Sequence, residues 1–261
     1  MREVLRDLNL LMPLVALPAL MALAASIGIV ATARQDTPFV SNLLEGIDLG
    51  RLPPGFLRLF AFSDLTDAQK NLLFVLKVVI FPIFWVIPVA LTSTIAADSF
   101  VGEKERRTIE PLLATPVSNR ELFFGKILTA VVPAVLGTWL SYLLFSFTVV
   151  RAINPRFPHP IFPDGDWYFA VGVLVPMLAL LSASIAALIS TRVATYRAAY
   201  QINGLVVLPV LLVFIPQTMG LYFFFPWALA AAALALLLLD VLFVGLSLRV
   251  FDREKILRGQ R

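Results

Sequence analysis

The chain has 261 residues, of which 59% are hydrophobic and only 15% are charged. Soluble domains carry about 25% charged residues, so this composition excludes an ordinary soluble protein and indicates a membrane protein. Cysteine is absent, which excludes disulfides and thiolate chemistry, and the net charge of +4 is spread over the loops, which favours membrane topology over nucleic-acid binding.

The apolar stretches predict an all-α integral membrane protein with six transmembrane helices in a single domain over residues 1–261. A bilayer core about 30 Å thick needs roughly 20 apolar residues, because an α-helix rises about 1.5 Å per residue. The run from 204 to 248 is too long for one span, and the stretch 216–220 is its natural break. The six expected spans are 10–33, 72–97, 122–150, 167–190, 198–215 and 221–248.

An outer loop at 34–70 separates the first two spans and is punctuated by glycine and proline. At its end, Thr66 and Gln69 match a capping box, which predicts that the next helix starts near Asp67. Lys77 lies inside the second span, close to one end of it. It either snorkels to the outer interface, the interpretation that its position favours, or lines a transport pathway.

The segment 98–121, between the second and third spans, is the longest polar stretch flanked by clearly apolar spans. Its density of charged residues is too high for hydrocarbon and places it in water. Five Lys or Arg residues between 98 and 126 favour the cytoplasmic side of the membrane. We therefore expect a cytoplasmic loop at 98–121.

Local chemistry within this loop predicts a short amphipathic helix from Ile109 to Ala114. Thr108 suits the N-cap position, and the charge of Glu110 in the first turn suits the helix dipole. Pro116 ends the helix, and a capping box at 118–121 opens the next one. The apolar face, built on i, i+3, i+4 spacing, consists of Ile109, Leu112 and Leu113. This face either rests on lipid headgroups or docks into a groove on a soluble partner.

Two features of the later spans bear on function. The fourth span ends in small residues, SASIAALIS, which let membrane helices approach closely. The last span contains Asp240, the one acid deep within an apolar stretch, which either serves function or bonds to a polar group of a neighbouring helix. No metal site is expected, because metal sites need several converging ligands and the single His159 lies in a proline-rich loop.

The charges of the loops predict that both termini are cytoplasmic. With the termini and the segment 98–126 inside, the inner segments carry 14 Lys or Arg residues and the outer segments carry 6. The two sets of segments have similar total length, so the bias follows the positive-inside rule. We therefore expect six spans with both ends on the cytoplasmic side.

The stretch GEKERRTIEPLLATPVSNRELFFGK resembles the signature loop of type-two ATP-binding-cassette (ABC) transporter permeases, the exporter family that includes sodium-extrusion and multidrug-type permeases. Arg107 departs from the pattern, since family members usually have glycine there. A second similar stretch, rich in Arg and Ala and followed by GLVVLPVLLV, matches at Arg192, Ala198, Gln201, Gly204, Leu208 and Pro209. The matching residues of the first stretch are Glu103, Lys104, Glu105, Arg106, Thr108, Glu110, Leu112, Leu113, Pro116, Gly125 and Lys126.

The resemblance implies a permease subunit of an ABC exporter in the cytoplasmic (inner) membrane. Its expected partners are a soluble ABC ATPase subunit, a second permease copy (the same or a related chain) and membrane lipids, with no cofactor and no nucleic acid. The chain has no P-loop, so it is not expected to be an enzyme and ATP hydrolysis is expected on the partner. The implied ATPase-coupling residues are Glu103, Lys104, Glu105, Arg106, Thr108, Ile109, Glu110, Leu112, Leu113 and Pro116.

Two other classes of protein remain open from the residues alone. An ATP-independent membrane scaffold or assembly factor would have no ATPase neighbour. An ion-coupled secondary carrier would depend on Asp240 and Lys77 as pathway residues, and would more often show internal repeats with broken helices. The transported substrate cannot be read from the sequence, because the spans offer few polar groups.

Overall fold

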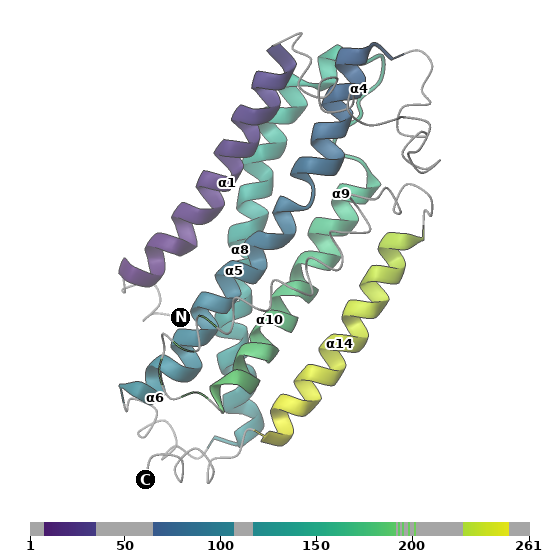
Figure 1. The fold of residues 1–261 in the computed structure, drawn as a ribbon. Helices are drawn as coiled ribbons and strands as arrows, with labels where there is room; N and C mark the ends of the chain where they lie inside the picture. Colours follow the sequence, from purple (N-terminus) through teal and green to yellow (C-terminus); the bar gives the residue numbers. More distant parts are fainter. Residues whose placement is uncertain are drawn as a thin grey trace.

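The computed structural model describes residues 8–34, 65–106, 117–191 and 227–250, and single positions between 193 and 201. All regular structure within these residues is helical, and the helices lie side by side in one elongated bundle (Figure 1). Five of the helical stretches are long and apolar enough to cross a membrane. The span expected at 198–215 and the short helix expected from Ile109 to Ala114 lie outside the described residues.

Three of these stretches each consist of one long α-helix, and one of the three is followed by a short 3-10 turn. They are α1 (Leu8–Arg34), α8 (Asn119–Ala152) followed by the 3-10 turn η4 (Asn154–Arg156), and α14 (Ala228–Val250). These elements agree with the first, third and last of the expected spans, because long apolar runs can satisfy their backbone groups in a membrane only as helices.

The second and fourth spans contain π-helical turns between α-helical parts. The second consists of α4 (Asp67–Phe74), η2 (Val75–Ile80), α5 (Ile83–Ala97), η3 (Asp98–Gly102) and α6 (Glu103–Glu105). The fourth consists of α9 (Gly165–Phe169), η5 (Ala170–Leu174) and α10 (Val175–Ser190). Such π-turns within α-helices are frequent at functional sites, and they are not visible in a hydropathy pattern.

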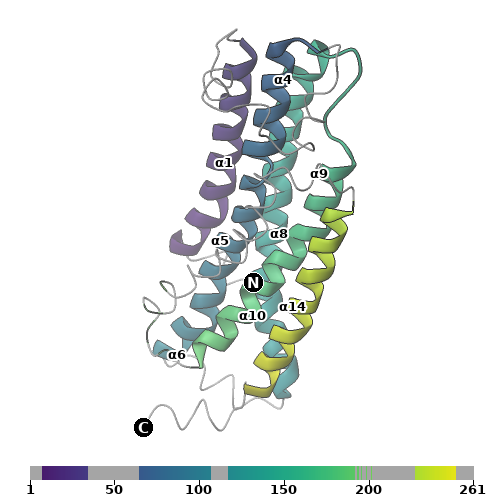
Figure 2. The same cartoon turned by 45° about the vertical axis from the view of Figure 1, so that its right-hand side comes forward.

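The two ends of the bundle are called the α4 end and the α6 end after the elements that lie there. From the α6 end, α1 and α8 run toward the α4 end, whereas the second span, the fourth span and α14 run the opposite way (Figure 1). Helix α14 lies along α10 at the edge of the bundle in both views (Figure 2). Near the α6 end, Ser247 Oγ of α14 donates a hydrogen bond of 2.9 Å to the carbonyl of Ser184 in α10.

The second span is the centre of the bundle and α14 is its periphery. Of the most apolar window of the second span, 76% of the residues are buried, compared with 17% for α14. Small residues of α10 pack against α5, where Ser93 and Ser182 share a buried hydrogen bond of 2.9 Å. The small residues at the end of the fourth span therefore mediate helix–helix contact within the subunit.

Both predicted capping boxes are present and define where two helices begin. The backbone N–H of Thr66 donates to Gln69 Oε1 at 2.8 Å, and α4 starts at the next residue, Asp67. At the start of α8, Ser118 and Glu121 exchange the two reciprocal bonds of a capping box. These side chains satisfy N–H groups that have no partner within the first turn of a helix.

Candidate functional site: the junction of the second and third spans

The helix of the second span does not end where its apolar stretch ends. The backbone remains helical past the predicted boundary at 97, through η3 and α6 to Glu105. This continuation is stable because Ser99, Phe100 and Val101 are buried, with the ring of Phe100 packed 6.4 Å, centroid to centroid, from that of Phe123 in α8. The beginning of the polar segment is thus part of the bundle.

Lys126 joins this continuation to the third span. It lies in α8 and is only 5% exposed. Its ammonium donates to the backbone carbonyl of Ser99 in η3, and to Glu103 Oε2 in α6 at 2.7 Å. The Nζ atom also lies 5.5 Å from the centroid of the Phe100 ring, within the range of a cation–π contact. A buried charge requires such partners, because an unpaired one is costly to remove from water.

A second ion pair lies along the same end of the second span. Arg106 Nη2 contacts Asp98 Oδ1 at 3.0 Å, across the residue Gly102. A Cβ atom at Gly102 would lie 2.5 Å from that same carboxylate oxygen. Glycine at this position therefore makes room for the Asp98 carboxylate beside the helix. We call these residues the ionic junction: Asp98, Ser99, Gly102, Glu103, Arg106 and Lys126.

Replacing Gly102 by alanine is expected to change the stability little. The new Cβ displaces the Asp98 carboxylate and so removes its ion pair with Arg106. Solvent-exposed ion pairs contribute about 0.2–1 kcal/mol to stability. Alanine in a helix gains about 0.5–1 kcal/mol over glycine, which offsets this loss. Thermal melting of the detergent-solubilised protein measures the net change in stability.

The matched control is Gly125→Ala, where nothing lies within 4 Å of the added Cβ. This variant should be stabilised by about 0.5–1 kcal/mol. Equal melting temperatures for the two variants would show that Asp98 is not in contact with Gly102.

The predicted coupling residues divide into two groups. Glu103 and Arg106 belong to the ionic junction, and Glu105 is an exposed residue at the end of α6. Lys104 is the middle residue of α6. The remaining predicted residues lie outside the described residues, so their role in coupling stays a prediction; they are Thr108, Ile109, Glu110, Leu112, Leu113 and Pro116.

Sequence reasoning missed Lys126, Asp98 and Gly102 as parts of the site. Lys126 was identified only as a residue that matches the signature loop, without a structural role. The partner that explains it, Glu103, is 23 positions earlier in the chain. The usable signal is that a lysine on an inward helix face requires a buried partner; the nearest acid, Glu121, is used in the capping box with Ser118.

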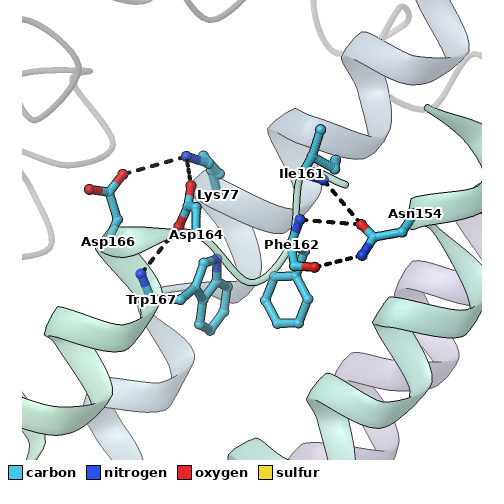
Figure 3. A network of polar contacts seen from close by, with 7 residues as sticks. All are labelled: Lys77, Asn154, Ile161, Phe162, Asp164, Asp166 and Trp167. Atoms are coloured by element: carbon cyan, nitrogen blue, oxygen red, sulfur yellow. Dashed lines mark hydrogen bonds and ion pairs between the residues drawn. The ribbon is translucent and has the colours of Figure 1, made fainter. Parts of the chain in front are cut away.

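At the α4 end, a second polar network surrounds Lys77 (Figure 3). Its ammonium is paired with the carboxylate of Asp164 and lies 3.4 Å from that of Asp166. Asp164 also accepts a hydrogen bond of 3.2 Å from the backbone N–H of Trp167 and so caps α9. The favoured prediction was that Lys77 snorkels to the interface; the structure pairs it with carboxylates at the start of the fourth span. Its role as a pathway residue stays a prediction.

The loop between the third and fourth spans is held by Asn154 at the same end (Figure 3). Asn154 Oδ1 accepts from the backbone N–H groups of Ile161 and Phe162, each at 3.2 Å. Its amide nitrogen donates to the carbonyl of Phe162 at 2.6 Å. Gln69 of α4 donates in turn to the carbonyl of Arg156. The α4 ends of the second, third and fourth spans are therefore tied together.

Beneath this network, Trp167 lies at the centre of an aromatic cluster. It is 1% exposed, and its neighbours belong to the second span, the third span and the preceding loop. The rings around it, with centroids between 4.7 and 5.8 Å from its own, are those of Phe81, Phe84, Tyr142, Phe145 and Phe162. Such edge-to-face and stacked contacts add to the burial energy of each ring.

Asp240 faces the interior of the bundle from α14 and is 3% exposed. Within the described part of the chain, neither of its carboxyl oxygens has a hydrogen-bond partner. The predicted alternative, a hydrogen bond to a polar group of a neighbouring helix, is thus not found among those residues. No group of three or more His, Asp or Glu side chains that would hold a metal ion occurs in the described ranges.

An all-helical bundle with several helices able to cross a bilayer defines a multi-pass membrane protein. Residues 1–226 match the family model described as ABC-2 family transporter protein, and the chain therefore belongs to that family. The resemblance to type-two ABC transporter permeases is confirmed, whereas the narrower likeness to sodium-extrusion permeases stays a prediction. Searches of curated proteins and of solved structures gave no significant match.

Proposed function

We propose that the chain is the membrane-spanning permease subunit of an ABC exporter that uses ATP hydrolysed by a separate ATPase subunit. Membership of the ABC-2 transporter family carries this proposal. The chain itself contains no P-loop, so the nucleotide site belongs to the partner. The working transporter contains two permease copies, or this chain and a related one, in the cytoplasmic membrane.

In this proposal the α6 end is cytoplasmic and the chain has six spans with both termini inside. The Lys and Arg residues concentrate in segments expected at this end. Helices α10 and α14 run in the same direction (Figure 1), so the end of α10 and the start of α14 lie at opposite ends of the bundle. That arrangement supports a span at 198–215.

The ATPase docks on the short helix proposed from Ile109 to Ala114. The two described ends that flank this segment, α6 and the start of α8, meet at the ionic junction. A displacement of the docking helix would thus be delivered to the second and third spans, and the second span is the most buried in the bundle. Coupling of this kind requires an element with two states that both ATP and the pathway bias.

Replacing both Leu112 and Leu113 by aspartate is expected to abolish recovery of the ATPase without preventing membrane insertion. The change places two charges on the face that would enter an apolar groove. The measurement is a pull-down of the tagged full-length chain from detergent, with mass spectrometry of the proteins that accompany it. Recovery of a P-loop ATPase by the wild-type chain is the expected result.

The matched control is the double replacement of Leu112 and Leu113 by methionine, which preserves apolar volume and should preserve binding. If the aspartate variant recovers as much ATPase as the wild type, the docking helix is assigned wrongly. If the wild-type chain itself recovers no ATPase under conditions that preserve known transporter complexes, the permease proposal is wrong.

One observation favours a second candidate, an ion-coupled secondary carrier. Asp240 is a buried acid whose oxygens have no hydrogen-bond partner among the described residues, as an ion-binding group of a carrier would be before it binds its ion. Lys77 supports this candidate less, because its charge is already paired with Asp164. Loss of transport on replacement of Asp240, in a chain that recovers no ATPase partner, would favour the carrier.

A further inference from the structure

The polar segment between the second and third spans begins and ends at one place. Glu103 stands at its start and Lys126 shortly after its end, and the two side chains are in contact at 2.7 Å. The same ammonium donates to the Ser99 carbonyl, which belongs to the backbone of the second span. Lys126 therefore holds both a side chain and a main-chain group of the neighbouring helix.

The burial of Lys126 makes this tie stiff. Its side chain is 6% exposed, so water cannot replace a partner that moves away. If the start of α8 slid relative to η3, a charged group would remain buried without its carboxylate, which is strongly unfavourable. An exposed ion pair would not resist such a displacement, because water and salt compensate for its loss.

The same two spans are also tied at the opposite end of the bundle. There Gln69 of α4 donates to the carbonyl of Arg156 after α8, whereas Lys77 pairs with Asp164 ahead of α9 and so ties the second span to the fourth. By contrast, the hydrogen bond found between α14 and α10 among the described residues is an uncharged one, from Ser247 to the carbonyl of Ser184. Among the described residues, the second and third spans therefore have polar contacts with each other near both of their ends.

We infer that Lys126 and Glu103 are positioning residues that hold the cytoplasmic ends of the second and third spans together, so that a push on the segment between them moves both spans as one body. This inference rests on the proposed function for the origin of the push. The tie itself is a property of the chain alone and can be measured without the ATPase.

The first experiment measures the separation of the two span ends directly. The chain contains no cysteine, so cysteines introduced at the exposed residues Glu105 and Phe124 can carry the only spin labels. Pulsed electron–electron double resonance of the full chain in nanodiscs, with the labelled chain diluted in unlabelled chain so that labels on two copies do not meet, is expected to give one narrow distance. Lys126→Met should broaden that distribution, because the ammonium that joins the helices is gone.

Further variants make the result specific. Glu103→Leu removes the partly exposed carboxylate but leaves the ammonium of Lys126 buried without it, so the double variant Glu103→Leu/Lys126→Met, which leaves no unpaired charge, decides the question if a single variant does not fold. Lys126→Arg keeps a charged donor and should recover the narrow distance at least in part. Arg120→Gln removes an exposed positive charge from the start of the same helix and should leave the distance unchanged.

The second readout uses the complex with the ATPase recovered in the pull-down. The ratio of its hydrolysis rate with and without the permease reports coupling. Glu103→Leu and Lys126→Met should bring this ratio close to one while the amount of bound ATPase stays the same. A merely structural loss would instead reduce the amount of folded, ATPase-bound permease.

The outcomes separate the two proposals. A narrow distance and an unchanged ratio in both Glu103→Leu and Lys126→Met would overturn the positioning role while leaving the permease proposal intact. Absence of any ATPase would overturn the permease proposal, and the distance measurement would still decide whether the tie exists. A broad distance in the wild-type chain would overturn the tie at once.

Discussion

Replacing Trp167 by alanine is expected to lower the free energy of unfolding by about 3–5 kcal/mol. The side chain is buried, and aromatic rings from two other spans and the preceding loop surround it. Removing it leaves a cavity that these rings can fill only in part, because they are held by their own helices. It also weakens the packing beneath the network around Lys77.

Thermal melting in detergent checks this, with a drop in melting temperature of roughly 10 °C expected for a chain of this size. The control is Trp167→Phe, which keeps an aromatic ring. Within the described residues the indole N–H of Trp167 has no acceptor, so phenylalanine loses no hydrogen bond. It should therefore cost much less than alanine. Equal losses for the two variants would show that the contacts of the indole ring, rather than aromatic packing in general, hold the cluster.

Replacing Asp240 by leucine is expected to raise the free energy of unfolding, by about 1–3 kcal/mol. The carboxyl group is buried and lacks a hydrogen-bond partner among the described residues, so its removal relieves an uncompensated cost. Leucine has a suitable size and suits the apolar surroundings of α14. Such a cost persists in proteins chiefly where the group serves function.

Two further variants test whether the effect comes from the unpartnered carboxyl group. Asp240→Asn keeps a buried polar group, so it should stabilise less than leucine does. Ser247→Ala removes a hydroxyl on the same face of α14 that does have a partner, the carbonyl of Ser184, and should destabilise by about 1 kcal/mol. The melting temperatures of the three variants in detergent give the comparison. A lower melting temperature for Asp240→Leu would mean that the carboxyl group has a stabilising partner.

The same variants bear on what Asp240 does. In an ion-coupled carrier, both the leucine and the asparagine variants should lose transport. In the ABC permease proposed here, recovery of the ATPase should be unchanged in both, because Asp240 lies in α14 and away from the ionic junction. Loss of ATPase binding in a stabilised Asp240→Leu protein would contradict that separation.

Helix starts were predictable because their signals are local. Thr66 with Gln69, and Ser118 with Glu121, satisfy the first free N–H groups from within one turn, so the sequence predicts them without knowledge of the fold. The extension of the second span to Glu105 was not predictable from hydropathy. It depends on the burial of Phe100 against Phe123, a contact between different helices.

The sequence predicts that a buried lysine requires an oppositely charged partner, but it does not predict which residue that partner is. Lys77 requires an acid or an interface, but the choice of Asp164 depends on the loop that Asn154 and the aromatic cluster hold in place. Lys126 likewise requires a partner, and η3 presents the Ser99 carbonyl to it because the second span continues past its apolar stretch. In each case the partner comes from a different span.

The residues alone were enough to identify a helical membrane protein, because a bilayer leaves a long apolar segment few alternatives to a helix. Its signature loop also indicated the transporter family that the match over residues 1–226 establishes. Which charges are buried and paired follows from how the helices pack against one another. The distance between Glu103 and Lys126 depends on how two helices pack, and no local pattern contains that information.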